Sequence, residues 1–482
     1  MRFKGRSFQK ISMFLKLGPL IISGLLFLFL LLIFGIWYRQ HAAVLVFEDT
    51  NLEVAVLRQL DQEKGPVLRR KGDQIRSLNA SNSQIQSLKG IEGLHALREL
   101  SLAHNQVTEL ESLMGLQELE VLDLSHNQVS DLTSIVSLKG LRQLVLDDNQ
   151  IVDASVLARL ENLERLSLAK NQLTGAWFLM GMSGLKRLDM SYNRIANLGG
   201  ISKLTGLEAL LLAGNRLMYL KGLDRLINLQ YLDIGKNQVR SIKELQFLKQ
   251  LRYLDLRHNQ IASLTPIQYL LQMEELNGSY NAFKSLVPIQ YMVRLRVCYM
   301  RGNGIKDVSV FRRLDQLQFL DLQYNQIQDV EPLSTLQQLE HLELSRNLIY
   351  DIEPMMGLSN LTQLHLNQNK IRYLPDMRAL SSLQTLSLSH NIISNILPLS
   401  QLTQLSYLNL RANQVGSVDA LAGLERLEWV SVARNRIEDI SVFQGLTALR
   451  QLQVMDNRIN QEDVAAQEIF GQLKARGVSV TY

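Results

Sequence analysis

The stretch LEVLDLSHNQV, residues 119–129, decides the fold of this 482-residue chain. Its frame is L-x-x-L-x-L-x-x-N-x-Z, where Z is Ile, Leu, Val or Phe. Apart from a few substituted leucines, the frame returns every 22 residues with no insertion or deletion. A fixed period of this length is typical of stacked repeats, each burying its apolar side chains against its neighbours. The 17 asparagines of the frame are Asn105, Asn127, Asn149, Asn171, Asn193, Asn215, Asn237, Asn259, Asn281, Asn303, Asn325, Asn347, Asn369, Asn391, Asn413, Asn435 and Asn457.

The apolar spacing changes within each copy, and the change predicts two kinds of local structure. Leu122 and Leu124 alternate with outward residues, which predicts a short strand with one buried face. After each asparagine the apolar residues come every third position, which favours a tight 3₁₀-like segment over an α-helix. The asparagine lies where the chain turns inward. We expect its amide to pair with backbone groups, because an orphaned buried polar group costs roughly 1–3 kcal/mol.

Five prolines support this placement of the outer segments. Each lies seven residues beyond its asparagine, where a helical turn would begin and a missing N–H is harmless. They are Pro266, Pro288, Pro332, Pro354 and Pro398. One further coil, with Ser83 in the asparagine slot, precedes the first asparagine.

The repeat therefore predicts an α/β solenoid: a leucine-rich repeat horseshoe or arc with a parallel concave β-sheet and 18 coils of 22 residues. Both ends of such a stack need covers. A helix from about Asp49 to Leu60, capped by Asp49 or Thr50, is the expected N-terminal cover, and a helix over 462–475 with a strand over 478–480 is the expected C-terminal one. The predicted layout is a basic tail over 1–16, a transmembrane helix over 17–38, a linker and helical cap over 39–74, repeats over 75–460 and a C-terminal cap over 461–482.

Residues 17–38 contain no charged residue and are long enough to span about 30 Å of hydrocarbon. Trp37 and Tyr38 end the segment, where amphipathic rings favour the interface. Five basic residues precede it and only Arg39 follows closely. The positive-inside rule then predicts a single-pass protein of the cell membrane with a cytoplasmic N-terminus and extracytoplasmic repeats. A cleaved signal peptide is the alternative, although its apolar region would be shorter, about 7–15 residues.

The net charge of +5 comes from the N-terminal region. Residues 1–47 hold six basic and no acidic residues, so the remainder is close to neutral and offers no basic stripe for a nucleic acid. Cys298 is the only cysteine, which excludes an intramolecular disulfide; its strand leucine slot predicts a small core residue. Because cysteine-rich end caps are lacking, a bacterial cell envelope protein fits better than an animal surface protein.

The stretch VFEDTNLE at 46–53, followed by LNAS at 78–81 and IQSLKGI at 85–91, resembles the N-terminal cap and first coil of bacterial internalin-like proteins. The 22-residue repeat class is shared with the regulatory subunits of eukaryotic protein phosphatase 1, and the resemblance covers about residues 46–482. It implies the fold and says little of function, because this fold carries unrelated binding roles. The immunoglobulin-like joining domain and wall anchor usual after internalin repeats are not visible here, so we do not infer an adhesin-invasin role.

The outward strand positions lie six, four and two residues before each asparagine, and they carry aromatic and arginine side chains. These residue types are enriched at protein-binding hot spots. Side chains one coil apart, such as Tyr231 and Tyr253, should lie about 5 Å apart; cross-strand packing alone is the alternative role. The predicted ligand-binding residues of the concave face are Tyr231, Tyr253, Tyr299, Arg301, Phe319, His341, Tyr407, Arg411 and Trp429, with Arg257 and Arg434 beside them.

Other polar residues predict less. The aspartates four residues before an asparagine, at positions 123, 189, 233, 255 and 321, are expected to be solvated rather than metal-bound. Two histidine pairs, His104 with His126 and His341 with His365, come from neighbouring coils, but without a third ligand neither predicts a metal site. No insertion supplies a catalytic loop, and no nucleophile, phosphate-loop or zinc-protease motif occurs, so we predict neither an enzyme nor a cofactor.

Two classes of function follow. The favoured one is a membrane-anchored, non-catalytic recognition protein that binds a protein or peptide, or in second place an envelope glycan, outside the cytoplasmic membrane. A pre-formed concave face would lose little ordering entropy on binding. The alternative is a cytoplasm-facing regulatory scaffold for an enzyme such as a phosphatase, which would need the hydrophobic segment to insert in the opposite sense.

Overall fold

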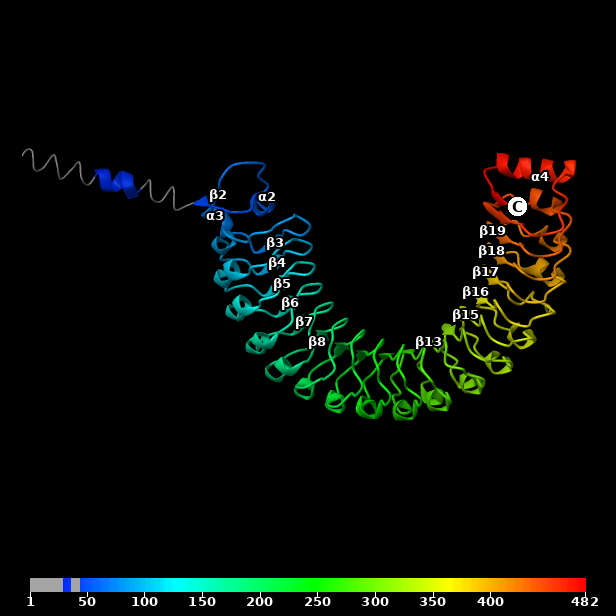
Figure 1. Ribbon diagram of the computed structural model, residues 1–482, viewed down its shortest axis with the longest axis horizontal. Helices are drawn as coiled ribbons and strands as arrows, with labels where there is room; N and C mark the ends of the chain where they lie inside the picture. The colour runs from blue at the N-terminus through cyan, green and yellow to red at the C-terminus, as the bar shows by residue number, and fades with distance from the viewer. Residues whose placement is uncertain (1–28, 36–43) are drawn as a thin grey trace, which may run out of the picture. The chain divides into compact units, whose positions relative to one another are not determined.

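The computed structural model describes residues 29–35 and 44–482 (Figure 1). Residues 29–35 are helical with exposed side chains. Most of the predicted transmembrane helix, 17–38, lies outside the described residues. Among those that are described, none of the helices combines the length and the apolar character needed to span a membrane. The chain divides into two compact units, Met1–Leu163 and Glu164–Tyr482.

The first unit, in its described part, places a small cap before a parallel sheet. The cap consists of β1 (Val44–Leu45), its antiparallel partner β2 (Val67–Leu68), α2 (Thr50–Gln59) and α3 (Arg69–Gly72). The parallel strands are β3 (Ser77–Asn79), β4 (Glu99–Ser101), β5 (Val121–Asp123) and β6 (Gln143–Val145). The outer 3₁₀ segments are η1 (Ile91–Gly93), η2 (Glu111–Gly115), η3 (Thr133–Ser137) and η4 (Ser155–Arg159).

The second unit curves, with its strands along the inner side and its 3₁₀ segments along the outer side (Figure 1). The strands are β7 (Arg165–Ser167), β8 (Arg187–Asp189), β9 (Ala209–Leu211), β10 (Tyr231–Asp233), β11 (Tyr253–Asp255), β12 (Glu275–Asn277), β13 (Val297–Tyr299), β14 (Phe319–Asp321), β15 (His341–Glu343), β16 (Gln363–His365), β17 (Thr385–Ser387), β18 (Tyr407–Asn409), β19 (Trp429–Ser431), β20 (Gln451–Gln453) and β21 (Ser479–Thr481). The 3₁₀ segments are η5 (Trp177–Gly181), η6 (Ile201–Lys203), η7 (Leu223–Arg225), η8 (Lys243–Phe247), η9 (Thr265–Ile267), η10 (Val287–Tyr291), η11 (Ser309–Arg313), η12 (Glu331–Leu333), η13 (Glu353–Met355), η14 (Leu397–Gln401), η15 (Asp419–Leu421) and η16 (Ser441–Gln444). The last helix is α4 (Val464–Ala475).

The repeat length sets the register of both sheets. Residues 22 positions apart face each other on neighbouring parallel strands, as Leu122 faces Leu144 in the first unit and Leu232 faces Leu254 in the second. The leucine-rich repeat solenoid with its long parallel sheet is therefore confirmed. A single stack of 18 coils running through both units stays a prediction.

The frame leucines form a continuous apolar core within each unit. Leu119, Leu122, Leu124 and Val129 of the opening stretch are all fully buried, and burying one such side chain stabilises the fold by roughly 1.5–3 kcal/mol. Cys298 is fully buried at the centre of β13, as predicted. All five prolines named above lie in the first turn of an outer 3₁₀ segment, which confirms their predicted role.

The asparagines link successive coils through their side-chain amides. Asn127 Nδ2 donates to the carbonyl oxygens of Leu102 (2.9 Å), Leu124 (3.1 Å) and Ser125 (3.1 Å), and its Oδ1 accepts from Val107 N at 2.9 Å. The pattern repeats through both units and pairs backbone groups that the inward turn would leave orphaned. Because one amide bonds two coils, the interaction fixes the stacking distance as well as the turn.

The residue directly before each asparagine adopts the left-handed region, which the sequence does not signal. In that region the Cβ of an L-residue costs roughly 1–2 kcal/mol, yet most of these residues are not glycine. The non-glycine residues at this position are His104, His126, Asp148, Lys170, Tyr192, Lys236, His258, Tyr280, Tyr324, Arg346, Gln368, His390, Ala412, Arg434 and Asp456, with φ between 51° and 59°. The backbone geometry that seats the asparagine therefore overrides local preference at nearly every coil.

Both ends of the repeat are covered. Helix α2 begins after Asp49, whose Oδ1 accepts from Asn51 N at 2.8 Å and whose Oδ2 accepts from Gln86 N at 2.7 Å in the first coil. At the other end α4 begins at Val464, two residues later than expected, and β21 pairs in parallel with β20 over 479–481. The β21 strand occupies the edge that β20 would otherwise leave unpaired.

Candidate ligand-binding surface

Aromatic side chains stack across neighbouring strands of the second unit. On β10 and β11, Tyr231 and Tyr253 face each other in register, with ring centroids 3.9 Å apart and planes 2° apart. On β18 and β19, Tyr407 and Trp429 do the same at 4.2 Å and 6°. These rings flank buried core residues in the strands, so they lie on the opposite, outward face of the sheet and are half-buried by one another.

Between these two pairs, rings from four successive strands form a continuous row. Tyr299 and Phe319 have centroids 4.8 Å apart, Phe319 and His341 4.5 Å, and His341 and His365 5.6 Å. We call the outward residues Tyr231, Tyr253, Tyr299, Phe319, His341, His365, Tyr407 and Trp429 the aromatic face. Stacked pairs of this kind contribute roughly 0.5–1.5 kcal/mol beyond area burial, so these side chains are held in place before any ligand arrives.

The predicted arginines lie in different settings. The Arg301 guanidinium lies 4.6 Å from the ring centroid of Tyr324 and 5.7 Å from that of Tyr280, within cation–π range. The guanidinium of Arg346 also lies over the Tyr324 ring, 4.4 Å from its centroid. Sequence reasoning missed Tyr280, Tyr324 and Arg346, because they occupy the turn position before an asparagine. A comparison of the residues one position before each asparagine, coil by coil, would have found them.

Three other arginines contact acidic or amide groups. Arg257 Nε lies 3.3 Å from Asp255 Oδ2, and Arg434 Nε lies 3.2 Å from Asp456 Oδ2. Arg411 donates through its backbone N–H to Asn409 Oδ1 at 3.1 Å. Arg301 is therefore the predicted arginine that the structure brings closest to a cluster of rings.

The expectation that the aspartate column is solvated is wrong for three of its members. Asp233, Asp255 and Asp321 lie on the same outward face as the rings two residues before them, yet they are buried, with relative exposures of 8%, 1% and 9%. Each accepts the backbone N–H two residues later, as Asp255 Oδ1 accepts from Arg257 N at 2.8 Å. Burial raises the pKa of Asp255 to about 6 despite the N–H and guanidinium of Arg257, and it also raises the pKa values of Asp233 and Asp321.

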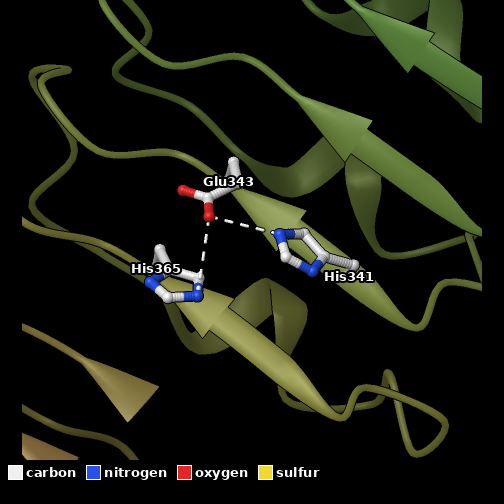
Figure 2. Close-up of side chains that lie close together, drawn as sticks. All are labelled: His341, Glu343 and His365. Atoms are coloured by element: carbon white, nitrogen blue, oxygen red, sulfur yellow. Dashed lines mark hydrogen bonds and ion pairs between the residues drawn. The ribbon is translucent and has the colours of Figure 1, made fainter. Parts of the chain in front are cut away.

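Glu343 joins the second histidine pair into a three-residue cluster (Figure 2). Its Oε1 lies 3.2 Å from His341 Nε2 and 3.5 Å from His365 Nε2. Candidate ligand atoms of the three residues all lie within 4.8 Å of one another. The third ligand that sequence reasoning did not find is thus present. The spacing could have indicated it: Glu343 is two residues from His341 on the same strand and 22 residues from His365, which places it opposite His365 on the next strand.

The first histidine pair has a different arrangement. His104 and His126 stack with centroids 4.0 Å apart, and His126 Nδ1 lies 2.8 Å from Asp148 Oδ2. Within the described residues of 29–35 and 44–482, the His341–Glu343–His365 cluster alone brings three histidine, cysteine or acidic side chains within metal-ligating distance.

Family models match several parts of the repeat region. Residues 73–114, 117–159, 227–269 and 381–423 match the model described as Leucine Rich repeats (2 copies), and residues 184–202 match the model described as Leucine Rich repeat. Among curated protein sequences no match is found.

Solved structures share the fold along most of the chain. A leucine-rich repeat protein of Leptospira interrogans is 23% identical, with 86% of this chain and 97% of that one covered and a TM-score of 0.63. The functional domain of InlJ from Listeria monocytogenes, which includes a cysteine ladder, is 22% identical over 85% of this chain and 80% of that one, with a TM-score of 0.57. The Arabidopsis receptor kinase HAESA, in complex with the peptide hormone IDA and the co-receptor SERK1, is 20% identical over 80% and 78%, with a TM-score of 0.56.

These likenesses agree with the prediction made from the sequence. The chain contains leucine-rich repeats, and its fold is similar to that of an internalin domain. It does not share the cysteine ladder, since Cys298 is its only cysteine. At identities below 25%, what is shared is the fold.

Proposed function

We propose that the chain is a non-catalytic recognition protein that binds a protein or peptide on the aromatic face of its second unit. The observation that carries the proposal is the set of half-exposed, mutually stacked rings: the pair on β10 and β11, the row on β13–β16 and the pair on β18 and β19. Preorganised aromatic side chains lose little rotamer entropy on binding and supply large contact area. The fold supports the same role, because HAESA, a structural neighbour, is solved with a peptide hormone.

The test removes two rings from the aromatic face. In the full chain, we expect Tyr253→Ala with Phe319→Ala to weaken capture of the native ligand at least tenfold, since removing one hot-spot residue alone commonly costs about 2 kcal/mol. The ligand is first identified by photo-crosslinking from a reactive residue placed at position 253, and affinity is then measured with the purified ligand.

Two exposed tyrosines away from the strands provide the matched control. Tyr350 and Tyr373 are 64% and 71% exposed, so Tyr350→Ala with Tyr373→Ala removes comparable ring area from the surface outside the aromatic face. Affinity should be unchanged in this control. Equal affinities for the two double variants would refute the proposal.

We further propose that residues 17–38 anchor the protein in the cell membrane with the repeats outside the cytoplasm. The uncharged segment and the basic residues before it support this orientation. The alternative, a cytoplasm-facing scaffold for an enzyme such as a phosphatase, needs the opposite insertion. An alkaline phosphatase moiety, active only outside the cytoplasm, is therefore fused after Tyr482. Phosphatase activity in intact cells is the expected result; an inactive fusion of normal abundance would favour the scaffold.

A further inference from the structure

The cluster of His341, Glu343 and His365 has the geometry of a preformed metal-binding triad. His341 and Glu343 are two residues apart on β15, so their side chains project from the same face of the strand. His365 on β16 lies directly across from Glu343 in the parallel register. All three side chains are only partly exposed, with side-chain exposures of 22%, 14% and 22%. The backbone thus fixes all three donors at one point of the sheet (Figure 2).

The donor spacing matches the coordination shell of a small divalent ion. Ligands bound at about 2.0–2.1 Å in a tetrahedral zinc site are separated by roughly 3.3–3.4 Å. The two nitrogen–oxygen distances here, 3.2 and 3.5 Å, already bracket that value. The two histidine rings need only small side-chain rotations to bring every donor atom onto one ion, because all candidate ligand atoms lie within 4.8 Å.

We propose that His341, Glu343 and His365 bind a divalent transition metal ion of the zinc type through two imidazole nitrogens and one carboxylate oxygen. Two histidines and a glutamate form a donor set that zinc commonly uses when it keeps a fourth position for water or another ligand. Calcium and magnesium prefer shells built of oxygen atoms and fit this set poorly. The fourth position would open onto the aromatic face.

The surroundings favour a bound cation and fix the ligands. Gln323 Nε2 donates to Glu343 Oε2 at 2.5 Å, which orients the carboxylate and leaves Oε1 toward the histidines. Asp321 faces Glu343 on the adjacent strand and adds negative charge. Phe319 stacks on His341 and restricts its ring. Partners that orient metal ligands in this way usually contribute to metal affinity.

The proposal is tested on the full chain after removal of metal with a chelator. Zn²⁺ is added in competition with a chromophoric chelator, and Co²⁺ is added separately to read coordination geometry from its visible absorption. We expect one Zn²⁺ per chain, a rise in the thermal unfolding midpoint on zinc addition, and the intense Co²⁺ bands of a tetrahedral site. Because Cys298 is fully buried in the core, no thiolate band should appear.

Single variants assign the ion to the triad. His365→Gln and Glu343→Gln should each weaken zinc binding by at least about 100-fold, and Gln323→Ala by about tenfold, the scale typical of groups that orient a ligand. His126→Gln is the matched control, since His126 also stacks on a histidine and contacts a carboxylate; its zinc affinity should equal that of the wild type. Far-UV circular dichroism verifies folding of each variant.

Two results would overturn the proposal: no stoichiometric zinc binding by the wild type, or equal affinity in the wild type and His365→Gln. The test needs no protein or peptide ligand. The metal site can therefore stand if the proposed recognition function fails, and the reverse also holds.

Discussion

The asparagine ladder shows why one residue type recurs at a single position in every coil. The side chain must donate to carbonyl groups of two coils and accept from a backbone N–H of the preceding coil, as Asn325 does with Met300 O, Leu322 O and Ile305 N. Aspartate lacks the donor. Ser83 departs from the ladder where no repeat coil precedes it, and its hydroxyl donates only to Ser81 O within its own turn. The substitution therefore marks the start of the stack.

The aspartate column shows how stacking changes the chemistry of one residue type. Asp123 and Asp189 remain partly exposed, whereas Asp233, Asp255 and Asp321 are buried. All five accept the N–H two residues later, so the local turn is the same. What differs is the extent to which neighbouring residues bury the carboxylates. Asn277 and Asn409 occupy the equivalent position and accept the same N–H, which shows that the turn needs an acceptor and not a charge.

Asp255→Asn should alter the pH dependence of stability in a defined direction. The pKa of Asp255 is raised to about 6 in the fold, against roughly 3.9 in an unfolded chain. Between these values the native state binds more protons than the unfolded state, so the wild-type free energy of unfolding falls as pH rises. The variant lacks this loss. Its stability relative to the wild type should increase by about 2–3 kcal/mol from pH 4 to pH 7.

Denaturant unfolding at several pH values measures this difference. Asp123→Asn is the matched control: it changes the same column at a partly exposed position, where solvent screens the charge, and its stability relative to the wild type should vary less with pH. Parallel stability profiles for the wild type and Asp255→Asn would show that burial of this carboxylate carries no energetic cost.

Among the elements, those set by periodicity could be predicted from the sequence, and those set by contacts across coils could not. The strands, outer 3₁₀ turns and end helices follow from apolar spacing, proline positions and Asp49 as N-cap. The left-handed residue before each asparagine could not be predicted, because residues such as Lys236 and Ala412 have no local preference for that conformation. Tertiary hydrogen bonds of the asparagine decide that conformation.

In the candidate binding surface, too, some features could be predicted from the sequence and others could not. The stacking of Tyr231 on Tyr253 and of Tyr407 on Trp429 was predictable, since residues 22 apart must be neighbours. The role of Glu343 was not predicted, because the acidic residues four positions before an asparagine were expected to be solvated rather than metal-bound. Register alone places that carboxylate between two histidines. The burial of Asp255 depends on how neighbouring side chains cover it, and no spacing rule supplies that information.

At the scale of the whole molecule, each coil bonds mainly to the coils before and after it. Within each unit, the pairing of repeat strands and the asparagine bonds between coils join residues about 20–25 positions apart, as Leu122 faces Leu144 and Asn127 Nδ2 donates to Leu102 O. Such a chain behaves as a nearly one-dimensional array in which stability is a sum of coil terms and interface terms. A complete coil should therefore be removable, whereas part of one should not.

Deleting residues 370–391 from the second unit should damage the fold less than deleting residues 370–380. The longer deletion joins Asn369 to Ile392, the residue after the next ladder asparagine, so every later strand keeps its register and its inward leucines. The shorter one removes the outer segment that carries the buried residues Ile371, Leu374 and Leu380. The chain that remains is too short to connect β16 to β17 around the outer side of the coil. We expect cooperative denaturant unfolding with a modestly lowered midpoint for the longer deletion. For the shorter one we expect rapid proteolysis beyond residue 369 and loss of the cooperative transition. Equal resistance to protease would mean that the stack tolerates broken register, and the one-dimensional description of this unit would then be wrong.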